Sequence, residues 1–400
     1  MKFGGTSVAD AERIKRAAQR IVAKREAGNR VVAVLSARGK TTDALIADAF
    51  EISPQPDPRE MDMLLSTGER QSCALCAMAI NDLGHRAISL TGSQAGIVTD
   101  TSHTKARILD VRANRISDAL DDDAIVLVAG FQGVSTAKDV TTLGRGGSDT
   151  TAVALAAAIG ADVCEIYTDV AGVFSADPRV VADARKLAVV SFEEMLEMSA
   201  SGAGVLQLRS VEYARTHGVR IHCRSSFSAA AGTIVGDDPA EGASARPAIT
   251  AVTHSTDEAR VTLEHVPDSP GMAGRIATVL ADANINIDMI IQNEPIAAGA
   301  GAEMSFTVPR ADLRHAIGSL SSLDANLGIE IETDESVGKI SVIGEGMKTQ
   351  SGVAAQVFTT LGEQGVNIQM IATSPIKISC VIGIESVPDA VRALHAAFLS

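Results

Sequence analysis

The sequence predicts an α/β protein with a three-layer α/β/α domain, whose sheet is mainly parallel, followed by two smaller α+β domains. Two features carry this prediction. Before residue 227, short runs rich in Val, Ile and Leu alternate with longer amphipathic segments, as expected for parallel strands joined by helices. After residue 250, one β-α-β-β-α pattern occurs twice. We therefore expect a first domain at 1–227, a small-residue linker at 228–250, and related domains at 251–335 and 336–400.

The strands of the first domain are expected in four apolar runs. These are VVAVLSA (31–37), RAISLTG (86–92), DAIVLVAGF (123–131) and ADVCEIYTD (161–169). Apolar runs of this kind are typical of strands buried on both faces. Polar motifs end each run, and ligands of parallel sheets bind beyond the carboxyl ends of the strands. The sequence therefore places a binding site at that edge of the sheet.

Three helices are expected early in the chain. The first begins at Asp10, which is suited to N-capping, and ends at Gly28. A second starts after Thr42, and a third covers about residues 60–83, after a Pro-rich loop at 53–58. The third carries Cys73 and Cys76 as C-x-x-C, with neither a second such pair nor histidines at ligand spacing. We interpret these cysteines as core residues.

The composition excludes several classes of protein. Of the 400 residues, 46% are hydrophobic and 21% charged, so the chain can bury large cores. A net charge of −14 argues against non-specific nucleic-acid binding, which needs a basic surface. There is no apolar run long enough to cross a membrane, and no apolar signal peptide. Five cysteines, an odd number, suggest free thiols and a cytoplasmic location.

The repeat lies in the last third of the chain. Residues 269–290 align without gaps on residues 350–371, at a constant offset of 81. The coinciding pairs are Gly271/Gly352, Leu280/Leu361, Asn286/Asn367 and Met289/Met370. Twin domains of this kind are expected to pack sheet to sheet and to bind ligands where they meet.

Two glycine-rich stretches are candidate anion sites. In MKFGGTSV, Lys2 precedes Gly4 and Gly5, which allow close approach of the backbone to a ligand. On these residues alone, a phosphate cradle and a flexible N-terminus with incidental glycines remain open alternatives.

The second stretch is TTLGRGGSDTTAVALAAAIG (141–160). It offers Arg145 beside the start of an Ala-rich helix that Ser148 and Asp149 are expected to cap. Arginine can grip a carboxylate or phosphate with two parallel hydrogen bonds.

Two familiar nucleotide motifs are missing. Gly39-Lys40-Thr41 resembles the end of a P-loop, but Val34 stands where the motif requires glycine. No G-x-G-x-x-G follows the first strand. Any nucleotide site is therefore of another kind.

Together, six motifs resemble the aspartate kinase family in their order along the chain. They are KFGGTSV, SARGKTTD, MLLSTGER, AGFQGV, TTLGRGGSDTTA and EIYTDVAGVFSADPR. The resemblance covers nearly all of residues 2–400. It implies an amino-acid-kinase domain at 1–227 and two ferredoxin-like ACT domains after the linker. It also implies a transferase that moves the γ-phosphoryl group of ATP to the β-carboxylate of L-aspartate, beginning lysine, threonine and methionine biosynthesis.

The resemblance assigns residues to aspartate and to the phosphoryl group. Lys2, Gly4, Gly5, Arg145 and Asp169 are implied in catalysis, with Lys2 and the N–H groups of Gly4 and Gly5 as the clamp on the transferring phosphoryl group. Arg145 is expected to hold the α-carboxylate of aspartate and Glu69 its ammonium group. The same pocket is expected to contain Ser36, Thr42, Phe131, Gly147, Ser148 and Asp149.

It also assigns a nucleotide site and an effector site. ATP is expected at Lys2, Gly4, Gly5, Thr168, Asp169, Phe174, Asp177, Pro178 and Arg179, with Mg²⁺ held through ATP and no direct protein ligand. An inhibitory amino acid, lysine or threonine, is expected at Asp268, Gly271, Met272, Ala273, Gln292, Gly352, Val353, Asn367 and Ile368. ACT pairing implies a homodimer or larger oligomer, with a small regulatory subunit as a further possible partner.

The chain departs from the family pattern at two places. Gly204 stands where relatives carry a lysine that reaches the ATP phosphates, with Arg209 or Lys186 as candidate replacements. Only Met1 precedes Lys2, where relatives have a short apolar strand, so either the natural start lies upstream or a central strand is missing. These departures leave an alternative open, a catalytically weak homologue that senses an amino acid. Another carboxylate or carbamate kinase is a third reading.

Overall fold

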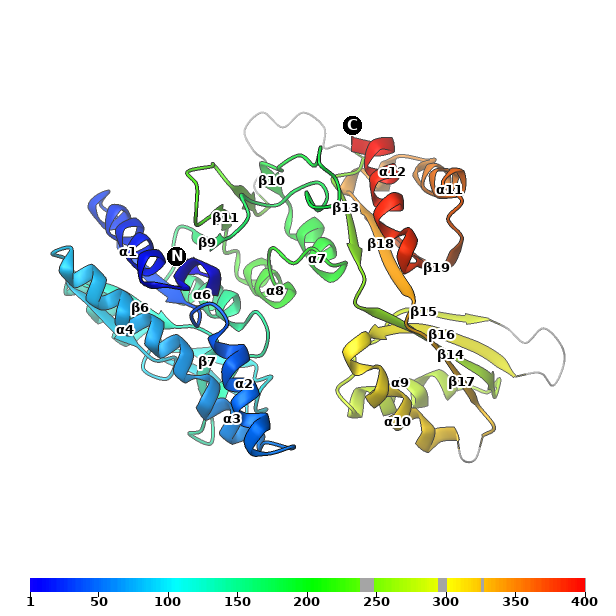
Figure 1. Ribbon diagram of the computed structural model, residues 1–400, viewed down its shortest axis with the longest axis horizontal. Helices are drawn as coiled ribbons and strands as arrows, with labels where there is room; N and C mark the ends of the chain where they lie inside the picture. Colours follow the sequence, from blue (N-terminus) through cyan, green and yellow to red (C-terminus); the bar gives the residue numbers. More distant parts are fainter. Residues whose placement is uncertain (238–247, 294–300, 325–326, 400) are drawn as a thin grey trace. The chain divides into compact units, whose positions relative to one another are not determined.

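The computed structural model describes residues 1–237, 248–293, 301–324 and 327–399. The chain forms two compact units. The first contains residues 1–173, 186–199 and 204–242, and the second contains residues 174–185, 200–203 and 243–400. In Figure 1 the colours run from blue to green through most of the first unit and from yellow-green to red through the second.

An eight-stranded sheet forms the centre of the first unit, in the order β10-β12-β11-β9-β1-β2-β6-β3. All its neighbouring strands are parallel except β11 and β12. The strands are β1 (Lys2–Phe3), β2 (Val32–Leu35), β3 (Ala87–Leu90), β6 (Ile125–Ala129), β9 (Cys164–Thr168), β10 (Val189–Val190), β11 (Ile221–Ser225) and β12 (Thr233–Val235). The predicted parallel sheet is confirmed.

Helices cover both faces of this sheet. Alternate residues of a strand point to opposite faces. On β2, Leu35 packs with residues of helices α1 and α4, whereas Val34 lies on the face of helix α6, close to Gly130. The helices of the unit are α1 (Ala11–Glu26), α2 (Thr41–Ile52), α3 (Pro58–Leu65), α4 (Thr67–Asp82), α5 (Asn114–Asp121), α6 (Gly147–Ala158), α7 (Phe192–Ala200) and α8 (Leu208–His217). The predicted three layers are present.

Helix α1 begins and ends where the sequence predicts. The Asp10 carboxylate accepts a hydrogen bond from the N–H of Arg13 at 2.9 Å, which satisfies one free N–H of the first turn. Gly28 follows the helix with φ +89°, a conformation that glycine adopts without strain.

The single helix predicted over 60–83 is two helices, α3 and α4, which meet at Ser66. The carbonyl of Ser66 accepts a hydrogen bond from Gln132 Nε2 at 2.8 Å. The hydroxyls of Ser66 and Thr67 donate to the carbonyls of Met63 and Leu64. Side-chain bonds of this kind compete with the helix's own ladder. Cys73 and Cys76 are buried free thiols, as predicted.

A second, four-stranded sheet of the first unit was not predicted. Its order is β5-β4-β7-β8. The strands are β4 (Ile97–Thr99), β5 (Ile108–Val111), β7 (Gln132–Ser135) and β8 (Val140–Thr142). Strands this short have too few residues to show a clear alternation in sequence.

The second unit contains two four-stranded sheets, with two long helices beside each. One has the order β15-β16-β14-β17 and the other β13-β18-β20-β19. The strands are β13 (Ala251–Ser255), β14 (Glu258–Val266), β15 (Asp288–Asn293), β16 (Ala302–Pro309), β17 (Glu330–Asp334), β18 (Val337–Ile343), β19 (Ile368–Ser374) and β20 (Lys377–Gly383). The helices are α9 (Met272–Asp282), α10 (Leu313–Asp324), α11 (Val353–Glu363) and α12 (Val387–Leu399).

The predicted domain limits differ from the packed units at several places. Strand β13 opens the predicted 251–335 domain but pairs with β18 of the next one. Strand β12 lies inside the predicted linker 228–250 and belongs to the eight-stranded sheet. Residues 174–185 and 200–203 lie within the predicted 1–227 domain but belong to the second unit. Part of the linker, residues 238–247, lies outside the described residues.

Among the described residues, no helix is long and apolar enough to cross a membrane.

Candidate active site

The glycine turn after β1 lies at the carboxyl edge of the sheet. Strand β1 pairs with β2 on one side and β9 on the other, so the central strand is not missing. The N–H of Gly4 donates to the carbonyl of Tyr167 at 3.2 Å. This bond corrects the expectation that the N–H of Gly4 is free for a phosphate. A Cβ on Gly5 would lie 2.8 Å from the carbonyl oxygen of Ala37, so the glycine is needed for close packing.

Lys2 lies beside the start of helix α6. Its Nζ is 2.6 Å from Asp149 Oδ1, and both side chains are largely buried. Because Asp149 belongs to the first turn of α6, this ion pair brings the Lys2 turn and the GRGG loop to one place. The two glycine-rich motifs predicted to act together are therefore neighbours.

The GRGG loop turns through two glycines with positive φ. Gly144 has φ +77° and Gly146 has φ +71°. Helix α6 follows with Gly146 at its N-cap and no side-chain cap bond. Ser148 and Asp149 therefore lie inside the first turn, and the expectation that they cap the helix is wrong. Arg145, between the glycines, is exposed.

Glu69 is the most unusual ionisable side chain of this edge. It is 3% exposed. Oε1 accepts a hydrogen bond from the N–H of Ala37 at 3.2 Å, while Oε2 is buried without a hydrogen-bond partner among the described residues. Burial raises the pKa of Glu69 to about 7. A buried carboxylate oxygen with no partner is suited to bind a cationic group.

The other predicted pocket residues lie around these two groups. Ser36 follows β2, and Thr42 lies in the first turn of α2. Phe131 follows β6 with φ +69°, and its Cδ2 lies about 3.0 Å from where a Cβ on Gly147 would be. A Cβ on Gly130 would lie 2.7 Å from Ser148 Oγ. The residues predicted to bind aspartate thus lie near the ends of β1, β2 and β6 and the start of α6.

The predicted nucleotide residues divide between the two units. Thr168 Oγ1 donates to Asp169 Oδ1 at 3.0 Å at the end of β9. Phe174 opens the segment 174–185 of the second unit. In that segment the Arg179 guanidinium and backbone N–H bind Asp177 at 2.7–3.1 Å, and the guanidinium holds the pKa of Asp177 below its ordinary value.

Two positions concern the number of cationic side chains at the site: Gly204, where relatives carry a lysine, and Arg38. Gly204 is exposed, with no atom within 4 Å of where a Cβ would lie, so a longer side chain has room there. Arg209, a candidate replacement, donates to the carbonyl of Leu143 at 3.4 Å. Sequence reasoning missed Arg38, whose Nε is buried without a hydrogen-bond partner among the described residues. Arg38 lies between Ser36 and Thr42 in the sequence. Its side chain as a whole is half-buried, so only the buried Nε distinguishes it.

The predicted effector residues occupy matching places in the two repeats. Gly271 and Gly352 precede helices α9 and α11 with φ of +91° and +96°. Met272 and Val353 are buried. Ala273 is exposed in the first turn of α9. The remaining predicted effector residues are exposed or half-buried in the loops and strands beside these helices: Asp268, Gln292, Asn367 and Ile368.

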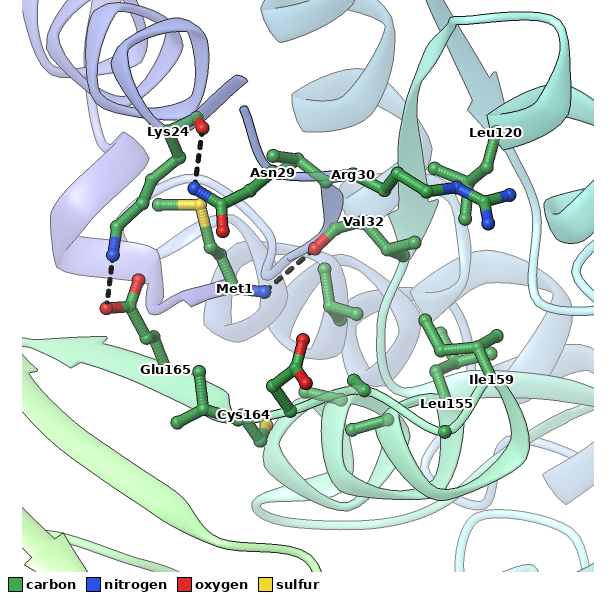
Figure 2. Close-up of a pocket in the computed structure, with 18 of the residues that line it drawn as sticks. Met1, Lys24, Asn29, Arg30, Val32, Leu120, Leu155, Ile159, Cys164 and Glu165 are labelled. Atoms are coloured by element: carbon green, nitrogen blue, oxygen red, sulfur yellow. Dashed lines mark hydrogen bonds and ion pairs between the residues drawn. The ribbon is translucent and has the colours of Figure 1, made fainter. Parts of the chain in front are cut away.

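A cavity of about 500 Å³ lies at the opposite edge of the sheet, and no predicted site residue lines it. Figure 2 shows the Met1 ammonium donating to the carbonyl of Val32, at 2.8 Å, and Lys24 paired with Glu165. Burial lowers the pKa of the Met1 ammonium. Since ligands of parallel sheets bind at the carboxyl ends of the strands, we do not assign catalysis to this cavity.

Comparisons with known proteins agree with this geometry. Residues 1–225 match the family model described as "Amino acid kinase family", and residues 261–325 and 340–398 match ACT domain models. The aspartokinase of Mycolicibacterium smegmatis is 54% identical over 99% of this chain and 95% of its own length. The chain belongs to the aspartokinase family.

Solved aspartokinases share the fold. The aspartate kinase of Synechocystis is 31% identical, with a TM-score of 0.81 over 99% of this chain and 97% of its own. Aspartokinase III of E. coli, solved with lysine and aspartate in a T-state, is 25% identical, with a TM-score of 0.76 over 100% of this chain and 99% of its own.

Proposed function

We propose that this chain transfers the γ-phosphoryl group of ATP to the β-carboxylate of L-aspartate and forms 4-phospho-L-aspartate. The observation that carries the proposal is Glu69 Oε2, which is buried and has no partner in the described part of the chain, at the edge where Lys2 and the GRGG loop meet. The aspartokinase relatives of the chain support it. The proposed product begins the route to lysine, threonine and methionine.

The reaction needs charge and position rather than a general base. A β-carboxylate has an ordinary pKa of about 3.9, so at pH 7 it is already a nucleophilic anion. The barrier lies in bringing this anion against the phosphates, and catalysis comes from cationic groups and alignment.

Aspartate is held at its other two charged groups. Arg145 binds the α-carboxylate with paired hydrogen bonds, and Glu69 Oε2 accepts from the α-ammonium group. The hydroxyls of Ser36, Thr42 and Ser148 and the ring of Phe131 complete the pocket. Held in this way, the β-carboxylate points towards the transferring phosphoryl group.

Lys2 stabilises the transferring phosphoryl group. Its pairing with Asp149 fixes the ammonium group in place before substrate binds, which lowers the reorganisation needed in the transition state. The N–H of Gly5 assists, whereas that of Gly4 is engaged with Tyr167.

ATP is held by Thr168, Asp169, Phe174, Asp177, Pro178 and Arg179. The exposed carboxylate of Asp169 fits a magnesium–nucleotide complex, because Mg²⁺ takes oxygen ligands and keeps several waters. When bound, Mg²⁺ would neutralise part of the negative charge of the phosphates.

Lysine or threonine inhibits by binding near Gly271–Ala273 or Gly352–Val353. The E. coli enzyme solved with lysine supports this regulation. Calorimetry that finds binding of neither amino acid would contradict this proposed inhibition.

The ACT units also mediate self-association, with a homodimer as the smallest assembly. Light scattering on the purified chain measures this.

The test of the function is formation of acyl phosphate. Hydroxylamine traps 4-phospho-aspartate as a hydroxamate, which should appear only with both ATP and aspartate present. Arg145→Ala should raise KM for aspartate about 100-fold, because the α-carboxylate loses its paired donors. Arg115→Ala, an exposed position on α5, is the matched control. Absence of hydroxamate from the intact chain would favour the sensor reading instead.

A further inference from the structure

Residues 174–185 are built into the core of the C-terminal ACT unit. The segment leaves the kinase-type sheet after β9 and rejoins it at β10. Between these strands, Ala176 and Val181 are buried in one hydrophobic cluster with residues of β18, α11 and α12. The segment that holds the proposed nucleotide residues is therefore not a free surface loop of the first unit.

Ser175 is the polar centre of this attachment. It is 2% exposed. Its N–H donates to the carbonyl of Arg185 at 2.8 Å, and its carbonyl accepts from the N–H of Val252, on β13, at 2.8 Å. Its Oγ accepts from the N–H of Arg185 at 2.9 Å and lies 2.9 Å from Nε2 of His395. Every polar atom of Ser175 is thus engaged.

His395 reaches Ser175 from helix α12, near the C-terminal end of the chain. It is also 2% exposed. Burial and the nearby Arg185 guanidinium lower the pKa of His395, while Asp183 opposes them. The imidazole is therefore neutral at pH 7 and forms an ordinary hydrogen bond with the serine hydroxyl.

Three of the residues proposed to hold ATP, Asp177, Pro178 and Arg179, begin two positions after Ser175. The carbonyl of Asp177 accepts from the N–H groups of Val180 and Val181, both at 2.9 Å, which closes a tight turn. Val181 is one of the buried anchors of that turn. The conformation of Asp177–Arg179 is thus fixed on one side by Ser175 and on the other by Val181.

We infer that His395 is a positioning residue for nucleotide binding: through its hydrogen bond to Ser175, helix α12 of the ACT unit holds Asp177–Arg179 in the conformation that binds ATP. This inference rests on the proposed function, in which those residues contact the nucleotide.

The test compares the binding of nucleotide with the binding of aspartate in variants of His395. His395→Leu removes the hydrogen bond and leaves Ser175 Oγ buried with one partner fewer. It should raise KM for ATP and the Kd of ADP about tenfold, while KM for aspartate stays within twofold. His395→Gln, whose Nε can replace the imidazole Nε2, should recover most of the affinity. His315→Leu, at an exposed position on α10, is the control.

Two further measurements keep the inference open to refutation. Ser175→Ala should give at least the loss seen in His395→Leu, because it removes the bond to His395 and also the bond from the Arg185 N–H. The double variant should be no worse than Ser175→Ala alone, because the bond to His395 is already absent there. Amide hydrogen exchange should become faster across 174–185 in each variant and remain unchanged in α9 and α10. If His395→Leu folds poorly, Ser175→Ala carries the comparison.

The outcomes distinguish this inference from the proposed function. No hydroxamate from the wild-type chain refutes the function itself. An active wild-type chain, with variants in which KM for ATP is unchanged or in which both KM values rise together, overturns the positioning role and leaves the function intact.

Discussion

The carboxylate of Glu69 is buried, and only one of its two oxygens accepts a hydrogen bond from the described residues. One carboxylate oxygen accepts from the Ala37 N–H, and the other has no partner among the residues that the structure describes. Burial of an ionised carboxylate is costly without compensation, so the pKa rises. In the proposed complex the α-ammonium of aspartate supplies the missing compensation.

Aspartate affinity should depend on pH through Glu69. Its pKa of about 7 means that below neutrality the side chain is protonated and cannot pair with the ammonium group. KM for aspartate should therefore fall as pH rises from 6 to 8, measured by the hydroxamate assay. In Glu69→Gln, KM should be high and nearly independent of pH. An unchanged pH profile in that variant would contradict the assignment.

The same shift affects stability in the opposite direction. Between about pH 4.5 and 7 the folded chain keeps a proton that the unfolded chain has lost, so the free energy of unfolding falls as pH rises. Chemical denaturation of the wild type and of Glu69→Gln at pH 5 and 8 measures this effect. The wild type should lose more stability than the variant between these two pH values.

Gly4 and Gly5 should respond differently to alanine. A Cβ on Gly4 would have its nearest neighbour at 3.6 Å, whereas one on Gly5 would lie 2.8 Å from the Ala37 carbonyl oxygen and 3.3 Å from that of Gly39. Gly5→Ala must therefore displace backbone, and kcat should fall at least tenfold with a lower Tm. Gly4→Ala should change both values little. Equal effects would show that the turn does not have this packing.

Among the elements, β1 differs most from its neighbours. Strand β1 has two residues, whereas its neighbours β2 and β9 have four and five. Met1, which directly precedes β1, lines the cavity. The Met1 ammonium is buried there, and burial lowers its pKa. Unfilled volume and a poorly solvated charge therefore lie side by side at Met1.

Lengthening β1 should stabilise the protein. A variant with four Val or Ile residues added before Met1 would move the ammonium group towards solvent and bury apolar side chains, each contributing about 1.5–3 kcal/mol when fully buried. Calorimetry should show Tm higher by several degrees. A Gly-Ser extension of equal length is the control, and equal Tm values for the two extensions would contradict the interpretation.

Elements with local signals could be predicted from the sequence, and those decided by distant partners could not. Asp10 and Gly28 mark the ends of α1 through their own chemistry. The break between α3 and α4 depends on Gln132, which lies 66 residues beyond Ser66. For the same reason, the role of the Gly4 N–H was wrongly assigned: its acceptor, Tyr167, is remote in sequence.

At the scale of the whole molecule, the sequence shows the two repeats, but it does not show that the first repeat is inserted between two paired strands of the second domain. Residues 251–255 have the pattern of a strand, yet nothing local shows that they pair with β18 rather than with the strand that follows. The repeat-related Met289 and Met370 pack in one small cluster with Val337 and Val381. The sequence revealed these methionines as equivalent, and the structure shows that they are neighbours.

A buried lysine also connects the two repeats. Lys339 on β18 lies 2.8 Å from Glu258 on β14 and 2.9 Å from Asp288 on β15, with its side chain 3% exposed. Although burial alone would lower the pKa of Lys339, the two carboxylates raise it above its ordinary value. Charges so placed are stable only as a group.

Lys339→Met should therefore destabilise the chain by about 2–3 kcal/mol. This is below the usual cost of breaking a buried pair, because Asp288 is half exposed. Denaturant unfolding measures the change, with Lys348→Met, at an exposed position, as the control. The double variant Lys339→Met/Glu258→Gln should recover part of the loss. Equal stability of Lys339→Met and wild type would show that the group contributes nothing.

The pairing of Ser255 with Lys339 has a consequence for how such a chain could be rebuilt. The segment from β14 to β17 is inserted between β13 and β18, which are neighbours in one antiparallel sheet, so the two ends of the segment lie close together. A cassette bounded in this way can be exchanged for that of a relative in a single recombination event, and the surrounding sheet keeps its strand order. New effector preferences could therefore arise without redesign of the catalytic half.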